Sequence, residues 1–250
     1  MRTRYEVYLD GTPLSAVDPA ILVTDVEECA PREALLSAAY ARGHGTHLLS
    51  RRRESLSVRV SFMIREYDPV RRKAVLGEVL AWAAGTCLSL EDRPGQHLTV
   101  VCAEPPVLQS ALRWTDTLRM VLTAYAFPFW ESDAPVTARA LGHEGSVLLR
   151  PAGTAPCCVL QARLTNRDTA MLGRVTLRAQ DRHITLEGMQ AAPGEAVSMV
   201  RDGHLLQLPA AFRTPDSADE LLLPQGRAST VSFSADAHVE AEFFARGVWL

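Results

Sequence analysis

The stretch LSRRRESLSVRVSFMIREYDPVRRKAVLGEVLAWAAG, residues 49–85, decides the fold of this chain. Its middle section alternates without interruption, and successive side chains of a strand point to opposite faces of a sheet. The apolar face is Leu56, Val58, Val60, Phe62 and Ile64, and the polar face is Ser57, Arg59, Ser61, Met63 and Arg65. The pattern predicts an antiparallel strand that is wet on one side. Burial of the five apolar side chains would stabilise the fold by roughly 8 to 15 kcal/mol.

A helix is predicted directly after this strand. Asp68 is a good N-cap, and Pro69 suits the first helical position, where the missing N–H costs nothing. The apolar face between Val75 and Ala83 and the following Gly85 predict one helix at about 69–84. Arg71 and Arg72 oppose the helix dipole in its first turn, which points to a partner outside the chain.

Composition excludes several classes of protein. The chain has 250 residues, is 47% hydrophobic and 22% charged, and carries a formal net charge of -3. These are values of a globular protein without a global attraction to nucleic acid or anionic membranes. The first 15 residues lack an apolar segment, and no stretch approaches the ~18 apolar residues of a membrane span. We therefore expect a soluble, unexported product.

Metal and disulfide signals are weak. The five cysteines are odd in number and lack C-x-x-C spacing, so neither a disulfide framework nor a zinc knuckle is indicated. His44 and His47 lie three apart in a glycine-containing loop, and Cys87, His97 and Cys102 form a second neighbourhood. Neither group has recognised zinc spacing, and a solvated loop is the favoured interpretation of the first. We predict no metal and no cofactor.

Catalytic signatures are also missing from the sequence. It contains no G-x-S-x-G, H-E-x-x-H, P-loop or G-x-G-x-x-G motif. A glycosidase needs only two carboxylates, and Asp116, Glu131 and Asp133 lie near Trp114 and Trp130, which could stack on a sugar. Packing of both tryptophans in a core or interface is the favoured interpretation. We predict that the protein is not an enzyme.

The rest of the first half gives mixed signals. Asp10-Gly11 predicts a tight hairpin, and Pro94-Gly95 predicts a type II turn between two strands. Further strands are expected around residues 20–27 and 118–127. The segment 29–48 fits either a short helix that ends at Gly43 or an extended arm, and periodicity does not separate these alternatives.

The second half predicts a different architecture. The stretch FPFWESDAP, about residues 128–136, reads as a boundary, and short strands with frequent turns follow it without intervening helices. Asp202-Gly203 marks another tight hairpin. Strands at this spacing predict a β-sandwich. Most of its aromatic residues are expected in the core, and they are Phe212, Phe233, Phe243, Phe244 and Trp249.

Three stretches together resemble the distal tail proteins of long, non-contractile-tailed phages and related prophages. They are the segment from the Arg51 block to Pro106, LRWTDTLRMVLTAYAFPFWE, and SADELLLPQGRASTVSFSADAHVEAEFFARGVWL. The resemblance implies an N-terminal belt domain at residues 1–135 that assembles as a hexameric ring. It also implies a galectin-like β-sandwich at residues 136–250.

The same resemblance implies the partners and the location. Such rings lie in the virion tail, contact the tail tube protein on one side, and contact tape-measure, tip and receptor-binding components on the other. They are assembled in the host bacterial cytoplasm. The implied function is that of a structural baseplate component.

A ring interface requires polar surfaces that meet another copy. The candidates are Arg51, Arg52, Arg53, Arg59 and Arg65, together with the ambiguous segment 29–48. Taken alone, the arginine triplet is more simply a solvated strand entrance. The alternative function is a carbohydrate-binding module of a host-recognition apparatus, which would use the concave face of the second domain.

Overall fold

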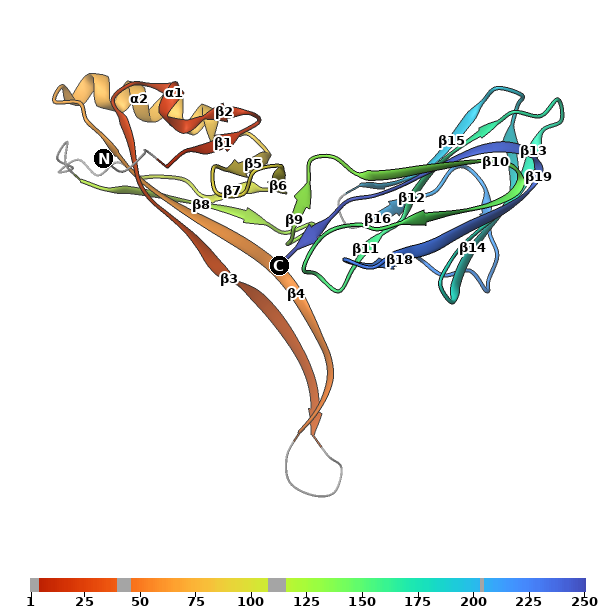
Figure 1. Cartoon of the computed structure of the whole chain (residues 1–250). Helices are drawn as coiled ribbons and strands as arrows, with labels where there is room; N and C mark the ends of the chain where they lie inside the picture. The colour runs from red at the N-terminus through yellow and green to blue at the C-terminus, as the bar shows by residue number, and fades with distance from the viewer. Residues whose placement is uncertain (1–4, 40–45, 108–115, 203–204) are drawn as a thin grey trace. The chain divides into compact units, whose positions relative to one another are not determined.

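The structure is a computed structural model that describes residues 5–39, 46–107, 116–202 and 205–250, without the side chains of residues 30, 37–39, 46–52, 202 and 205. The chain divides into two compact units, Met1–Trp130 and Glu131–Leu250. Antiparallel strands dominate both units (Figure 1). The predicted mainly β fold class is confirmed.

The first unit combines two sheets with two helices. One sheet has the strand order β3-β4-β8-β7, and the other contains β2-β1-β5-β6. The strands are β1 (Val7–Leu9), β2 (Thr12–Pro13), β3 (Ile21–Ala39), β4 (Thr46–Ile64), β5 (Cys87–Leu90), β6 (Gln96–Thr99), β7 (Val101–Glu104) and β8 (Leu118–Ala124). The helices are α1 (Leu14–Val17) and α2 (Pro69–Trp82).

Strand β4 holds the core of the first unit. It lies between β3 and β8, with Val60 opposite Val26 and Met120. All five apolar side chains of the predicted buried face are 0–5% exposed. Helix α2 contributes Val75 and Val79 to the same core. A slip of one residue would bring the polar set inward, so this pattern fixes the register.

The polar face of β4 is less wet than predicted. Arg59 and Ser57 are partly exposed, but Ser61 is buried. Ser61 is a short side chain between Asp25 on β3 and Arg119 on β8. The longer side chains on the flanking strands shield Ser61 from solvent. The alternation within β4 alone does not predict this shielding.

The helix signals are confirmed with two differences. The Asp68 carboxylate accepts a hydrogen bond from the Val70 N–H at 3.0 Å, as an N-cap should. Helix α2 ends at Trp82, two residues before the predicted end. The sequence predicted a single helix, but α1 is a second one of four residues. A helix this short gives no detectable periodicity.

Arg71 and Arg72 both have partners within the chain. Arg71 pairs with Asp18, whose side chain is 5% exposed, so its charge is compensated within the chain. Arg72 is buried and donates hydrogen bonds to the carbonyl oxygens of Glu66 and Tyr67. Both arginines therefore fasten the start of α2, and the expected outside partner stays a prediction.

The segment 29–48 is extended wherever the structure describes it. It continues β3 to Ala39 and resumes in β4 at Thr46, and Leu35 lies opposite Arg51. Strand β8 pairs with β4 only from Leu56 onward. Residues 31–39 and 46–54 therefore form a two-stranded ribbon, here called the arm (Figure 1). The open choice between helix and arm is settled in favour of the arm.

The predicted tight turns are present. Asp10 and Gly11 join β1 to β2 with φ of 49° and 78°, the positive values that this dipeptide tolerates. Gly95, with φ of 74°, lies between β5 and β6. Asp202 pairs with Leu205, as a tight hairpin requires, while Gly203 lies outside the described residues.

The second unit is built around two long strands, β10 and β19. Strand β19 pairs with β10 along one edge, and its other edge pairs with β13 near its start and with β12 near its end. The strands are β9 (Trp130–Ser132), β10 (Val136–Leu149), β11 (Cys157–Val159), β12 (Gln161–Asn166), β13 (Leu172–Ala179), β14 (Arg182–Ala191), β15 (Ala196–Asp202), β16 (Leu205–Gln207), β17 (Phe212–Arg213), β18 (Leu222–Pro224), β19 (Ser229–Ala245) and β20 (Val248–Trp249). Two sheet halves, β12-β15-β16 and β13-β14-β17, thus branch from one shared pair.

The core of this unit fits a β-sandwich. Side chains at odd positions of β19 point inward, among them Phe233 and Phe243, whose ring centroids are 6.1 Å apart. The expectation that Phe212 belongs to the core was wrong, because its side chain is 80% exposed. Phe212 lies on a two-residue edge strand and covers Gly188, too near the sheet margin to be enclosed.

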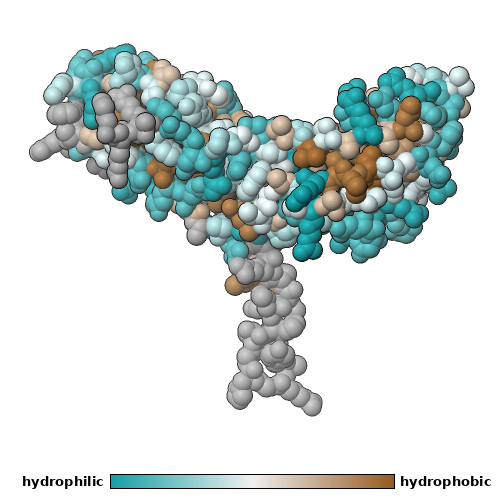
Figure 2. All heavy atoms as spheres, in the orientation of Figure 1, coloured by the Kyte–Doolittle hydropathy of each residue, from teal (hydrophilic) through white to brown (hydrophobic). Residues whose placement is uncertain are grey.

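The surface of the first unit is polar near helix α2. Hydrophilic residues predominate over the part of the first unit that carries α2 (Figure 2). Among the described residues, no helix has the length and apolar character needed to cross a membrane.

Candidate assembly interface

The polar face of the sheet β3-β4-β8-β7 is held by cross-strand contacts. Ser57 Oγ and Thr123 Oγ1 are 2.9 Å apart, and Arg59 Nη1 donates to Glu27 Oε2 at 2.6 Å. A shallow depression of about 350 Å³ lies on this face. Its lining residues are Cys29, Arg32, Ser55, Ser57, Arg59, Ala103, Glu104, Val121, Thr123 and Tyr125. The face therefore offers mixed polar groups and one exposed aromatic ring, that of Tyr125.

The structure spreads the predicted interface arginines along β4. Arg51 and Arg52 lie in the arm opposite Leu35 and Ala34, and their side chains are outside the described residues. The Arg53 guanidinium lies 5.0 Å from the centre of the Phe129 ring, a cation–π contact within the unit.

Arg59 and Arg65 both lie outside the core. The side chain of Arg59 is 40% exposed beside Glu27. Arg65 follows the last residue of β4, and it is exposed. The five arginines thus mark a line from the arm to the end of β4 and do not form one compact cluster.

The arm carries apolar surface that its own unit does not cover. The Leu35 side chain is 63% exposed, and the neighbouring Leu36 side chain is 59% exposed. Consecutive residues of a strand point to opposite faces, so each face of the ribbon presents a leucine to solvent. The sequence shows the apolar triplet ALL at residues 34–36. Its exposure on both faces of a ribbon could be inferred only once the segment is known to be a strand.

A polar cluster fastens the base of the arm. The Arg93 guanidinium binds both carboxylate oxygens of Glu28, at 2.7 and 2.9 Å, and lies 4.8 Å from the centre of the Trp130 ring. Trp130 Nε1 also donates to Glu28 at 3.2 Å. Burial and the hydrogen bond to Asp92 raise the pKa of the nearby Tyr5 hydroxyl. Sequence reasoning missed Glu28 and Arg93, because 65 residues separate them and neither belongs to a motif.

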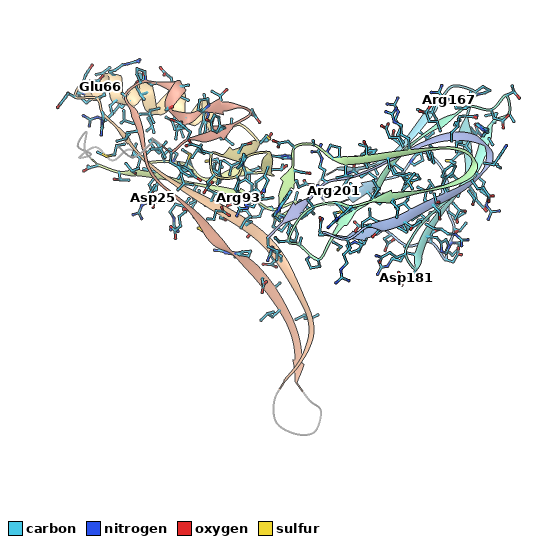
Figure 3. The ribbon with its side chains drawn as sticks, in the orientation of Figure 1. Asp25, Glu66, Arg93, Arg167, Asp181 and Arg201 are labelled. Atoms are coloured by element: carbon cyan, nitrogen blue, oxygen red, sulfur yellow. The ribbon has the colours of Figure 1, made fainter. Side chains whose placement is uncertain are left out.

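Two of the proposed sugar-site residues, Trp130 and Glu131, have buried side chains that are part of the packing of the fold. Trp130 is buried, and Trp114 lies outside the described residues. Glu131, the first residue of the second unit, accepts a hydrogen bond from Arg201 in an ion pair whose side chains are 9% and 10% exposed. Glu131 therefore fixes β9 to the sandwich (Figure 3 labels Arg201).

The structure describes only some of the candidate metal ligands. Both His44 and the side chain of His47 lie outside the described residues. Within the described part of the chain, no group of three or more metal-ligating side chains converges. Burial raises the pKa of the Cys102 and Cys157 thiols, and it raises that of Cys158 to about 12. A thiol that stays protonated is a poor metal ligand.

Comparison with solved structures shows that this two-unit fold is a known one. Among solved structures, the chain is similar to the Dit (gp 19.1) protein of phage SPP1, described as a paradigm of the hub adsorption apparatus in phages that infect Gram-positive bacteria. The two align with a TM-score of 0.67 and 11% identity over 98% of this chain and 99% of that chain. At this identity the likeness shows the fold alone.

Other comparisons add context. Two structures of the phage p2 baseplate in its activated conformation, with strontium and with calcium, cover 97% and 99% of this chain at 10% and 8% identity. Their TM-scores are 0.46 and 0.45, so the fold assignment rests on the SPP1 protein. No family model and no curated protein sequence matches the chain.

Proposed function

We propose that this chain is a structural distal tail protein of a phage or prophage, which forms a ring between the tail tube and the tail tip. One observation carries the proposal: the similarity to SPP1 Dit covers 98% of this chain, and so both of its units, and 99% of that chain. Because a shared fold does not by itself fix function, the surfaces of this chain must also suit a ring subunit.

The arm supports assembly with further copies. A two-stranded ribbon is marginally stable in water on its own, and packing against another surface is its usual remedy. Leu35 and Leu36 are exposed on opposite faces of the ribbon, so each face offers a neighbour apolar area. A second copy of the chain is the partner that every ring subunit has available.

Two unlike edges of one sheet suit a closed ring. Rings need a heterologous interface, in which one surface of a subunit meets a different surface of the next. In the sheet β3-β4-β8-β7, one edge is β3, which runs into the arm, and the other is the short strand β7. Val101 on β7 is 51% exposed. The β3 edge and arm of one copy meet the β7 edge and polar depression of its neighbour.

The proposed role also specifies the ring size, the part played by each unit and the partners. The ring is a hexamer in the virion tail, and Met1–Trp130 forms the belt while Glu131–Leu250 projects as a galectin-like sandwich. Its partners are the tail tube protein on one side and tape-measure, tip and receptor-binding components on the other. The role is structural and not catalytic, which agrees with the use of Glu131 in a buried ion pair.

A paired-leucine variant tests the proposal. Leu35→Ser with Leu36→Ser should abolish the ring and leave the subunit folded, because these side chains contribute nothing to the core. The matched control is Leu148→Ser with Met171→Ser, which alters two side chains of the second unit that are 68% and 56% exposed. Light scattering reports the mass, and circular dichroism reports the fold. Rings that persist in the Leu35 and Leu36 variant would exclude the arm from the interface.

A further inference from the structure

A groove with an unusual charge arrangement crosses the second unit. It is a shallow depression of about 340 Å³ over β10, β19, β12 and the start of β15. Its lining residues are Arg139, Arg163, Thr165, Arg167, Gly194, Ala196, Glu240 and Glu242. An adjoining depression shares Arg139, Arg167 and Glu240 and extends to Leu141 and His238. The surface therefore joins polar groups to a partly apolar end.

Two ion pairs hold the groove in place. Arg139 donates to Glu242 Oε1 from Nε at 3.0 Å and from Nη2 at 2.7 Å. Arg167, labelled in Figure 3, donates to Glu240 Oε2 from Nε at 2.9 Å and from Nη2 at 2.6 Å. Hydrogen bonds from Arg167 and its positive charge keep the pKa of Glu240 below its usual range, so this carboxylate is ionised. Among the described residues, no other hydrogen bond engages the Nη1 group of either arginine or the second carboxylate oxygen of either glutamate.

Arg163 lies beside these pairs with its charge uncompensated. It is opposite Glu242 in the β12–β19 register, but Glu242 is bound by Arg139 on its other side. Among the residues that the structure describes, Arg163 has no hydrogen-bond or ion-pair partner. Three arginines face two glutamates, so the groove has one excess positive charge. The charge suits one anionic group, and the flanking donors and acceptors suit hydroxyls.

We propose that this groove binds an anionic saccharide or polyol chain, with its carboxylate or phosphate on Arg163 and its hydroxyls on the Arg139–Glu242 and Arg167–Glu240 pairs. A guanidinium binds either anion through two parallel hydrogen bonds. A hydroxyl both donates and accepts, which matches the alternation of arginine and glutamate along the groove. Leu141, which is 62% exposed, offers apolar contact to the carbon skeleton of the ligand.

Titration calorimetry on the full chain tests the site with four probes. Hyaluronate carries carboxylates, a glycerol phosphate polymer carries phosphates, dextran carries hydroxyls without charge, and tripolyphosphate carries charge without hydroxyls. Hyaluronate or the glycerol phosphate polymer should bind saturably, and the one that binds identifies the anion. Arg163→Ala should weaken that binding at least tenfold. Arg178→Ala removes the same charge from an exposed position on β13, outside the groove, and should leave the binding unchanged.

Several outcomes would overturn the proposal. One is the lack of saturable binding by either anionic polymer. Equal binding of dextran would refute the role of Arg163, and equal binding of tripolyphosphate would refute the role of the hydroxyls. Equal losses in the Arg163 and Arg178 variants would show nonspecific attraction. Because none of these measurements depends on ring formation, the site can fail while the proposed assembly holds, and the reverse.

Discussion

Arg59 and Glu27 face each other across β4 and β3, with Arg59 Nη1 2.6 Å from Glu27 Oε2. The two side chains are 40% and 54% exposed, and exposed pairs of this kind contribute about 0 to 1 kcal/mol to the stability of a subunit. The pair is therefore of little importance to folding. On the polar face of the proposed belt, it is well placed to contact a neighbouring copy.

Charge reversal at Arg59 should weaken the ring without unfolding the subunit. Arg59→Glu places a second carboxylate beside Glu27, and water screens most of the repulsion in the free subunit. Between copies the same surface loses water, so the reversed charge costs more there. Negative-stain images should show fewer closed rings, and the denaturant midpoint should barely move.

The charge-swapped double variant sharpens this test. Arg59→Glu with Glu27→Arg restores the pair within the subunit but leaves both charges inverted toward a neighbour. We expect normal stability and impaired rings. The control is Arg174→Glu, since Arg174 pairs with Glu187 on the exposed surface of the second unit. Unimpaired rings in the Arg59→Glu variant would remove this face from the interface.

The ion pair between Arg201 and Glu131 should matter far more to stability. Both side chains are about nine-tenths buried, and removal of one partner leaves the other charge buried and unpaired. Arg201→Met should lower the free energy of unfolding of the second unit by roughly 3 to 5 kcal/mol. Adding Glu131→Leu should recover much of the loss. Guanidinium unfolding measures both, and a loss no larger than that of Arg174→Met would contradict the buried pair.

Asp168 should make the second unit sensitive to acid. Hydrogen bonds from the backbone N–H groups of His238, Ala170 and Thr169 lower its pKa to about 2. A folded pKa below the unfolded value means that the stabilisation is complete above pH ~4 and is lost as the pH falls toward 2. Asp168→Ala should therefore differ from the parent protein at pH 5 and converge with it near pH 2. A constant difference in unfolding free energy across this range would contradict the assignment.

The first unit should contain the whole ring interface. A fragment of residues 1–135 should form the same closed ring as the full chain, because the arm and both sheet edges lie within it. Light scattering and electron microscopy of both proteins decide the point. If residues 136–250 form rings alone while the fragment stays monomeric, the belt has been assigned to the wrong unit.

Local signals predicted the parts of the fold that local physics determines. Alternation from Leu56 to Ile64 identified the central strand and its buried face, and Asp68 with Pro69 located the start of α2. The dipeptide Asp10-Gly11 likewise predicted the hairpin between β1 and β2. In each case, neighbouring residues settle the conformation without help from distant ones.

Other features depend on residues far away in the sequence. The arm has good helix formers in PREALLSAA, yet pairing with β4 overrides their propensity. Strand β19 runs unbroken from Ser229 to Ala245, and β10, which is distant in the sequence, pairs with both of its halves. Within the candidate interface, alternation placed Arg59 outside the core, but its partner Glu27 comes from another strand.

The central claim is tested most directly by electron microscopy of the purified full-length protein. Two-dimensional class averages should show closed rings with six subunits. Monomers at all accessible concentrations, or a two-fold dimer in which the same surface of both copies meets, would contradict the account.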